Sequence, residues 1–101
     1  MALRFEWGPA KAAINLHKHA ISFDIAVRVF ADPFALTEQV GVENGEQRWQ
    51  MLGIVEGYLL ALVAHTARDD DEDGQPIEVI RIISARRADR KERQRYEQET
   101  R

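Results

Sequence analysis

The chain has 101 residues, 45% of them hydrophobic and 31% charged, with a net charge of −3 and no cysteine. This length allows one domain with one modest core, over residues 1–101, and the composition is too apolar for a disordered protein. The lack of cysteine excludes disulfides and thiolate metal sites and suits a reducing compartment. The longest apolar run, residues 58–64, is too short to span a bilayer and no secretory signal pattern is present, so we expect a cytoplasmic protein without a membrane partner.

The first third of the chain predicts a short strand followed by two helices. Alternation indicates a strand over residues 3–7. Gly8-Pro9 opens a helix that we expect to stop near His19-Ala20, because proline favours the first helical position. Ser22 is a good N-cap for a second helix that ends at Asp32-Pro33. The apolar stripe of this second helix is predicted to lie in the core: Phe23, Ala26, Val27 and Phe30.

Four strands are expected after Pro33, where β-rich runs alternate with turn signals. The runs cover residues 34–40, 47–55, 58–67 and 77–85. Residues 58–64 are apolar on both faces, which is typical of a central strand that is covered on both sides. The acidic stretch 68–76 is interpreted as an exposed hairpin loop.

The last segment predicts a helix beginning at Asp89, with Glu92 three residues later in a capping-box arrangement. Tyr96 is its only large apolar residue, so we expect the position of the helix to depend on a partner. The order of strand, two helices, four strands and helix indicates an α+β fold. We expect an antiparallel sheet with two N-terminal helices and a C-terminal helix.

Charge is unevenly distributed. Residues 81–101 hold eight Lys or Arg against four Asp or Glu, whereas residues 1–80 hold six against thirteen. A segment of +4 on a body of −7 indicates a polyanionic partner or a partner protein with an acidic patch. A solvated helix surface is the alternative.

The sequence gives little support for a metal site or for nucleophilic catalysis. His17 and His19 are two residues apart and point to different sides of a helix, and His65 is interpreted as a packed, hydrogen-bonded residue of a strand. The acidic run lacks the ligand pattern of a calcium loop, and there is no GxSxG or glycine-rich phosphate motif. We therefore expect no metal and no cofactor.

Basic residues are the better candidates for chemistry. Arg81 interrupts the apolar pattern of the strand 77–85, where it either pairs with a carboxylate across the sheet or faces a cleft. The same two alternatives apply to Arg48 in the strand 47–55. On strands expected to be adjacent, the two arginines would stabilise a phosphate, with Tyr96 nearby. Helical spacing puts Lys11, Asn15 and Lys18 on one face, and would do the same for Arg86, Arg90 and Arg93 if the last helix began early.

Several motifs together resemble the BrnT toxins of bacterial type II toxin–antitoxin systems: "FEW", "KAAINLHKHAISF", "VFADP", "GEQRW" and "RIISARRADRKERQRYE". The resemblance covers Phe5 to Glu97. It implies a RelE-like fold and a ribonuclease that arrests translation. It also implies a BrnA-like antitoxin that neutralises the toxin and supplies the contact with operator DNA.

When the functional residues of the family are matched to this chain motif by motif, the resemblance implies roles for eleven residues: Lys11, Asn15, Lys18, His19, Glu46, Arg48, Arg81, Ser84, Arg86, Glu92 and Tyr96. Gly8 and Ala20 depart from the acidic residue and the glycine that are common there in the family. Both positions concern helix caps, so these departures bear on stability more than on activity.

The resemblance and the basic residues together predict metal-independent RNA cleavage, in which a ribose 2′-hydroxyl attacks the adjacent phosphorus. Arg81, Arg48 and Lys18 would stabilise charge, while His19, Glu46 or Tyr96 would carry protons. The alternative role of His19 is to cap the end of its helix. RNA or antitoxin would contact a further set: Lys11, Asn15, Arg86, Arg90, Lys91 and Arg93. The alternative is a non-catalytic module that binds the antitoxin and nucleic acid.

Overall fold

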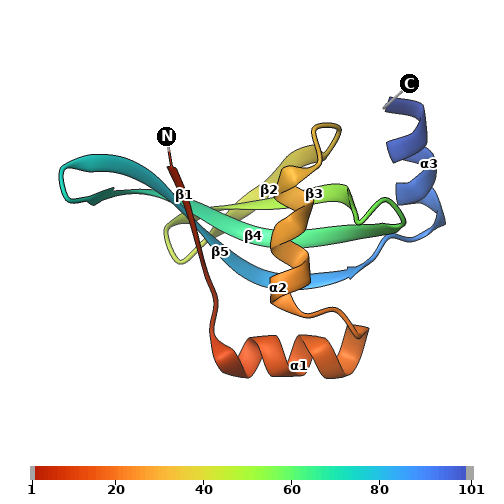
Figure 1. Ribbon diagram of the computed structural model, residues 1–101, viewed down its shortest axis with the longest axis horizontal. Helices are drawn as coiled ribbons and strands as arrows, with labels where there is room; N and C mark the ends of the chain where they lie inside the picture. The colour runs from red at the N-terminus through yellow and green to blue at the C-terminus, as the bar shows by residue number, and fades with distance from the viewer. Residues whose placement is uncertain (1, 100–101) are drawn as a thin grey trace.

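The computed structural model describes residues 2–99, which form one sheet with helices on both of its faces (Figure 1). The elements in chain order are β1 (Ala2–Glu6), α1 (Pro9–His19), α2 (Phe23–Ala26), the 3₁₀ helix η1 (Val27–Ala31), β2 (Leu36–Glu43), β3 (Glu46–Val55), β4 (Leu59–Glu72), β5 (Gln75–Arg87) and α3 (Arg90–Glu99). The predicted order of elements is therefore confirmed.

The sheet has the strand order β1-β5-β4-β3-β2. Strands β2 to β5 pair in antiparallel fashion, but β1 pairs with β5 in parallel, from Ala2 opposite Ile77 to Glu6 opposite Arg81. The expectation of an antiparallel sheet is thus wrong at β1, and the sheet is mixed. Parallel pairing directs the chain out of β1 toward the part of β5 that β1 does not cover, and α1 packs there.

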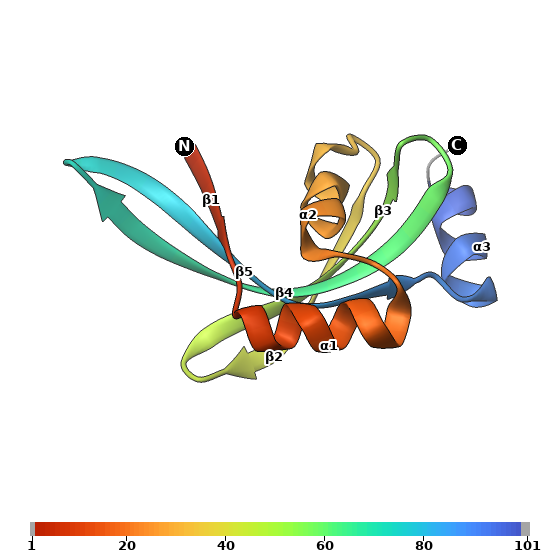
Figure 2. The ribbon, with the colours of Figure 1, turned by 60° about the horizontal axis from the view of Figure 1, so that its bottom comes forward.

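Strand β4 lies in the middle of the sheet, as its apolar sequence predicts. Beyond the body of the sheet, β4 and β5 continue as a long two-stranded ribbon that projects from the molecule (Figures 1 and 2). The prediction of a loop over residues 68–76 is wrong, because only Asp73 and Gly74 lie outside the strands. Both have positive φ, 52° and 79°, which suits the two-residue hairpin turn that an Asp-Gly pair favours.

One face of the sheet packs against α2 and η1. The side chain of Ser22 accepts a hydrogen bond from the Ile25 N–H, which confirms the predicted N-cap. Phe23 and Ala26 are buried in the core, whereas Val27 and Phe30 are only partly buried against it. Gly53 on β3 allows the close approach of η1, because a Cβ at this position would lie 2.8 Å from Cγ1 of Val29.

The opposite face is covered by α3 at one end only. Asp89 and Glu92 form the predicted capping box: Asp89 Oδ1 accepts from the Glu92 N–H at 2.8 Å, and Glu92 Oε1 accepts from the Asp89 N–H at 2.9 Å. Tyr96 packs with Leu52 and Leu60 in a small cluster under the helix. Within residues 2–99, no helix is long and apolar enough to cross a membrane.

A hydrogen bond anchors α3 to the chain's own core. The Tyr96 hydroxyl donates to Asp32 Oδ2 at 2.6 Å, and the Asp32 carboxylate also accepts from the N–H groups of Phe34 and Ile54. Burial by itself would raise the pKa of Asp32, but these hydrogen bonds outweigh it and lower the pKa. Burial, together with the bond to Asp32, raises the pKa of Tyr96 to about 12. The position of α3 is therefore held within this chain.

We predict that Tyr96→Phe lowers the free energy of unfolding by about 1.5–3 kcal/mol, because it removes a hydrogen bond to a charged acceptor. Tyr58→Phe is the matched control and should change it by less than about 0.5 kcal/mol, since Tyr58 is 74% exposed. Urea denaturation followed by circular dichroism measures both. Because the folded pKa of Asp32 is lowered, this stabilisation should be present above pH 3.8 and lost as the pH falls through the folded pKa.

Candidate functional site: a polar row on the open face of the sheet

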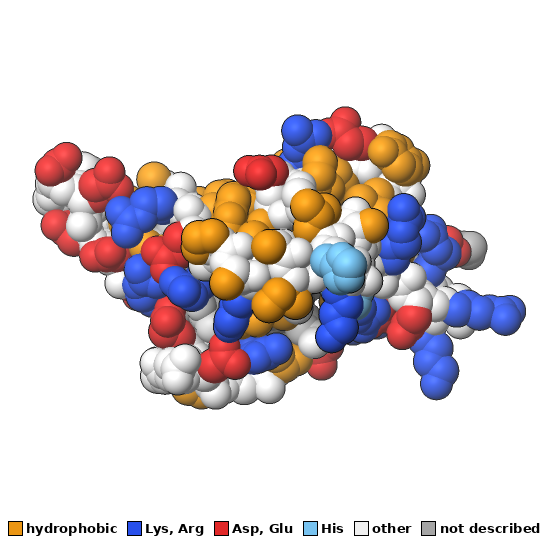
Figure 3. Space-filling view, turned by 90° about the horizontal axis from the view of Figure 1, so that it is seen from below, with side chains coloured by type: hydrophobic (Ala, Val, Ile, Leu, Met, Phe, Trp, Pro, Cys, Tyr) orange, Lys and Arg blue, Asp and Glu red, His pale blue; other side chains and the backbone are white. Residues whose placement is uncertain are grey.

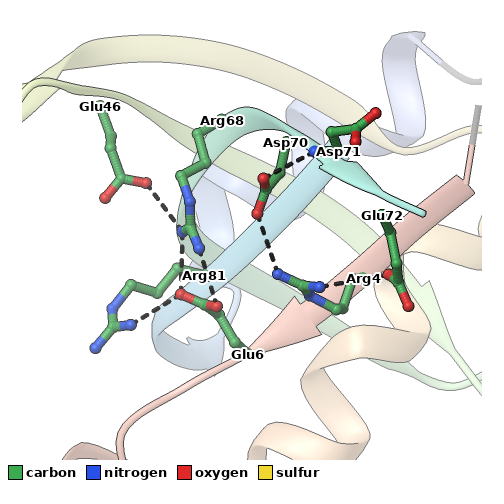
Figure 4. Close-up of polar contacts among 8 residues, drawn as sticks. All are labelled: Arg4, Glu6, Glu46, Arg68, Asp70, Asp71, Glu72 and Arg81. Carbon is green, nitrogen blue, oxygen red and sulfur yellow. Dashed lines mark hydrogen bonds and ion pairs between the residues drawn. The ribbon is translucent and has the colours of Figure 1, made fainter. Parts of the chain in front are cut away.

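The face that carries α3 is open and polar beyond the helix. Glu6, Arg81, Thr66 and Arg48 lie directly opposite one another on β1, β5, β4 and β3. Side chains of directly opposed residues share one face of a sheet, so these four form a line across it. Glu46 and Arg68 lie two residues from Arg48 and Thr66 along their strands and share this face. The six residues are termed the polar row, and Figure 4 labels four of them: Glu6, Glu46, Arg68 and Arg81.

A β-bulge sets which side chains join this row. Pairing between β4 and β5 shifts at Ala64/His65, so that Ser84 opposes Ala64 while Ile82 opposes His65, leaving Ile83 as the extra residue. The bulge interrupts the alternation that would have aligned Arg81 with both Ile83 and Ala85. Ala85 consequently packs in the core beside Ile82, while Arg81 stays on the open face.

Carboxylates neutralise the arginines of the row. Arg68 donates from Nη1 and Nη2 to Glu6 at 3.0 and 3.2 Å, and Arg81 Nη1 donates to the same carboxylate at 2.9 Å. Figure 4 shows both guanidinium groups directed at Glu6. The hydrogen bond from Arg68, with the smaller contribution of Arg81, lowers the pKa of Glu6 against the opposing effect of burial. Glu6 is therefore an ionised carboxylate that holds two arginines in place.

Glu46 is held more loosely. Its contacts are longer: Thr66 Oγ1 donates to Glu46 at 3.4 Å and Arg68 Nη1 at 3.5 Å. Arg48 instead donates to Glu43 at 2.8 Å. The sequence left open whether Arg48 and Arg81 pair with a carboxylate or face a cleft, and in the structure both are paired with carboxylates. The expectation that they lie on adjacent strands is wrong, because β4 with Thr66 lies between Arg48 on β3 and Arg81 on β5.

A groove runs between α1 and the edge of β5. This α1 groove encloses about 250 Å³ and is lined by five residues of the family motif: Lys11, Asn15, Lys18, His19 and Ser84. Arg81 lies near the start of α1, since a Cβ at Gly8 would lie 4.0 Å from Arg81 Nη2. Figure 3 views the molecule from the side of α1 and shows basic side chains and histidine around a patch of hydrophobic ones.

Asn15 lies at the base of the groove and is buried. Its Nδ2 donates to the carbonyl oxygens of Ala85 at 2.9 Å and Ile21 at 3.0 Å, and its Oδ1 accepts from the Ala85 N–H at 3.0 Å. The amide thus bonds the free edge of β5 beyond the end of β1. These bonds give Asn15 a positioning role within the chain, whereas Lys11 and Lys18 are exposed.

The basic residues near the C-terminus divide into two groups. Arg86 lies in β5 and forms two hydrogen bonds with Glu92, each of 2.9 Å. Because α3 begins only at Arg90, the conditional alignment of Arg86 with Arg90 and Arg93 on one helix does not arise. The α3 basic cluster, defined as Arg90, Lys91 and Arg93, is exposed. In Figure 3 basic side chains gather at the end of the molecule opposite the acidic tip of the β4–β5 ribbon.

Tyr96 lies outside the polar row. It packs beside Leu52, four residues along β3 from Arg48, which corresponds to about 13 Å at about 3.3 Å per residue. Its hydroxyl donates to Asp32, and its pKa of about 12 disfavours loss of the proton near neutral pH. The row does contain Arg81, Arg48 and Glu46, which the sequence had proposed for chemistry.

Sequence reasoning missed Glu6, Thr66 and Arg68. Arg68 had been placed in a loop, because the acidic residues after it hide the continuation of β4. Glu6 belongs to the "FEW" motif, but only the parallel pairing of β1 with β5 puts it beside Arg81. The described residues hold no group of three or more His, Asp or Glu side chains arranged to share a metal ion.

The fold and the site together define a small α+β protein whose open sheet face carries guanidinium groups of the kind that contact phosphates. Residues 7–92 match the family model described as ribonuclease toxin, BrnT, of type II toxin–antitoxin system. The chain belongs to this family, and membership in a type II system implies an antitoxin partner.

A solved structure supports the fold. The chain is similar to the 1.1 Å crystal structure of the Brucella abortus ribonuclease toxin BrnT, with a TM-score of 0.56 and 15% sequence identity over 89% of this chain and 100% of that one. At this identity the likeness concerns the fold. No curated protein matches the chain.

We predict that Asn15→Ala lowers the free energy of unfolding by at least about 3 kcal/mol, because three buried backbone groups lose their partner at about 1–3 kcal/mol each. Leu16→Ala is the control on the same helix, and it should change stability by less than about 0.5 kcal/mol since Leu16 is 51% exposed. Urea denaturation decides the matter. Equal effects of the two substitutions would show that the amide bonds do not hold α1.

Proposed function

We propose that this protein is a metal-independent endoribonuclease that cleaves RNA at the polar row. The observation that carries the proposal is the convergence of Arg48, Arg68 and Arg81 with Glu46 on one open face, where Arg81 also lies near Gly8 at the start of α1. Such a surface supplies positive charge for a phosphate and a carboxylate for proton transfer.

The proposed reaction is attack of a ribose 2′-hydroxyl on the adjacent phosphorus. Negative charge grows on the phosphoryl oxygens in the transition state, so donors aimed at those oxygens accelerate the step. The Arg81 side chain is 44% exposed, and a guanidinium has five N–H donors, so Arg81 keeps donors for phosphate while it is bonded to Glu6. Arg48 and Lys18 would hold the phosphates on either side.

Glu46 is the better candidate for the general base. Glu6 is bound by two arginines that lower its pKa, which weakens it as a proton acceptor. Glu46 has only long contacts and lies beside Thr66 in the middle of the row. His19, in the last turn of α1, lines the groove beside Ser84, which is five residues along β5 from Val79, the residue opposite Arg68. It is therefore a proton-transfer candidate at the groove and not the partner of Glu46 at one phosphate. Tyr96 takes no part in this scheme.

The same proposal extends to the cellular role. We infer a RelE-like domain that arrests translation by cutting RNA in the cytoplasm and that a BrnA-like antitoxin neutralises. The antitoxin would also supply the contact with operator DNA. The order of two N-terminal helices, an antiparallel meander and a C-terminal helix supports the RelE-like part.

A non-catalytic module for antitoxin and nucleic-acid binding is the second candidate. One observation favours it: each arginine of the row is paired with a carboxylate, so the resting site is neutralised. In that case RNA would be retained without being cut.

We predict that the purified protein cleaves RNA in the presence of EDTA and that Arg81→Ala lowers the cleavage rate by about 10²-fold or more. Arg4→Ala is the matched control, because Arg4 also lies on the sheet in ion pairs, with Asp70 and Glu72, but outside the row. Its rate should stay within about twofold, since it removes only exposed pairs. Loss of all cleavage in EDTA, or an unchanged rate for a folded Arg81→Ala protein, would overturn the proposal; retention of RNA without cleavage would establish the binding module.

A second test addresses the α3 basic cluster. We predict that replacing Arg90, Lys91 and Arg93 by Gln makes RNA affinity less dependent on salt, by a slope of about 0.7 for each lost phosphate contact. Arg95→Gln is the control on the same helix, since Arg95 pairs with Glu38 and Glu99. Affinity is measured across a salt series with a non-cleavable 2′-deoxy strand. If only antitoxin affinity falls, the cluster serves the partner protein; if neither changes, it is a solvated surface.

A further inference from the structure

Glu46 is a carboxylate of the polar row that has no close contact. It lies at the start of β3, directly opposite Glu43 of β2, and its side chain is 25% exposed. Its two contacts both involve Oε2 and are long, with Thr66 Oγ1 at 3.4 Å and Arg68 Nη1 at 3.5 Å. A charge-assisted hydrogen bond from a guanidinium is normally about 2.7–2.9 Å long, so Arg68 does not bind Glu46 closely.

Arg48 and Arg68 both lie near Glu46, and each binds another carboxylate. Arg48, two residues along β3 on the same face, donates to Glu43 at 2.8 Å. Arg68 donates from two nitrogens to Glu6, at 3.0 and 3.2 Å. Figure 4 shows the guanidinium of Arg68 between Glu46 and Glu6, with dashed lines to both. Both arginines are therefore occupied by carboxylates other than Glu46.

Arg68 is the cation that would pair with Glu46 if Glu6 were absent. Its Nη1 already contacts both carboxylates, Glu6 at 3.0 Å and Glu46 at 3.5 Å, so a small movement exchanges one for the other. The pKa of Arg68 is raised, and the hydrogen bond to Glu6 is the largest cause, with Glu46 contributing less. An opposite charge in direct contact stabilises the ionised form of a carboxylate, which makes the carboxylate a weaker base.

The register of the sheet allows Glu6 to reach Arg68 across β5. Glu6 on β1 lies directly opposite Arg81, whereas Arg68 on β4 lies opposite Val79. Since β1 and β4 are the two neighbours of β5, Glu6 and Arg68 lie on either side of this strand. Arg81 Nη1 donates a further hydrogen bond to Glu6 at 2.9 Å. The Glu6 carboxylate is thus held in place by Arg81 while it binds Arg68.

We propose that Glu6 is a positioning residue, which binds Arg68 and so keeps its guanidinium from pairing with Glu46. Glu46 then stays free to accept the proton of the ribose 2′-hydroxyl. The inference rests on the proposed role of Glu46 as the general base. It gives a reason for a carboxylate at a site for a polyanion: Glu6 weakens the attraction for phosphate, but it preserves the proton acceptor.

The first test follows the ionisation of Glu46 directly and needs no activity. Protein labelled with ¹³C at the glutamate carboxyl groups is titrated by NMR, and Glu46→Gln identifies the resonance. Glu6→Gln should move the titration midpoint of Glu46 to lower pH by about one pH unit, because Arg68 then pairs with it. Glu72→Gln is the matched control. It also removes a carboxylate that pairs with an arginine, Arg4, but four residues along β4 from Arg68, and should leave the midpoint within about 0.2 pH unit.

Removal of Arg68 separates the proposed route from a general loss of structure. In Arg68→Gln protein the further change Glu6→Gln should leave the midpoint of Glu46 in place, because the guanidinium that Glu6 restrains is gone. Glu6→Thr replaces Glu6→Gln if the latter does not fold, since a β-branched residue suits a strand. A midpoint that does not fall in a folded Glu6 variant, or that falls equally in the Arg68→Gln background, overturns the inference.

Cleavage rates test the link to catalysis. In the same Glu6 variant the acid limb of the pH–rate profile should move to lower pH, and kcat at neutral pH should fall by about threefold or more, as expected of a weaker base. KM should not rise, because a competitor of the phosphate is removed. If the midpoint falls but Glu46→Gln protein cleaves RNA at the wild-type rate, the contact is confirmed and the proposed general base is wrong. If the midpoint does not fall, the inference is wrong whatever the rates.

Discussion

The amide of Asn15 is the interaction on which the site depends. β1 covers the edge of β5 only as far as Arg81, so the N–H and C=O of Ala85 would otherwise be left without partners. Asn15 satisfies both and adds a bond to Ile21 at the turn that follows α1. Buried backbone groups are costly to leave unpaired, so these bonds fix α1 along β5. The lysines of the α1 groove, Lys11 and Lys18, are thereby held beside Ser84.

One face of the sheet serves two purposes at once. Its apolar end, with Leu52 and Leu60, packs under Tyr96 and stabilises the fold. Its polar end on the same strands carries Arg48 and Thr66, where no helix covers the sheet. The carboxylates of this end hold the guanidinium groups in position while the protein is free, and a phosphate would have to compete with them. If the row binds RNA as proposed, this charge neutralisation would limit non-specific binding while it holds the guanidinium donors in place.

Charge is also separated along the molecule, whose longest dimension is 42 Å. The acidic tip of the β4–β5 ribbon and the α3 basic cluster lie at opposite ends (Figure 3). At physiological salt, charges further apart than about 8 Å act nearly independently, so the ribbon does not cancel the field of α3. A polyanion would meet the basic end first and then the row, and the acidic ribbon would repel it from the far end.

The sequence by itself determined the elements and their order, because their signals are local. The cap at Ser22, the capping box of Asp89 and Glu92 and the alternation within each strand depend on residues a few positions apart. It also singled out Arg48, Arg81 and Glu46, through strand positions unusual for charge and through a family motif. Only the tertiary structure decided which of these meet, since the parallel pairing of β1, the bulge at Ile83 and the partners of each arginine depend on register between strands distant in sequence. Glu6 and Arg68 are 62 residues apart along the chain, and no local pattern carries that contact.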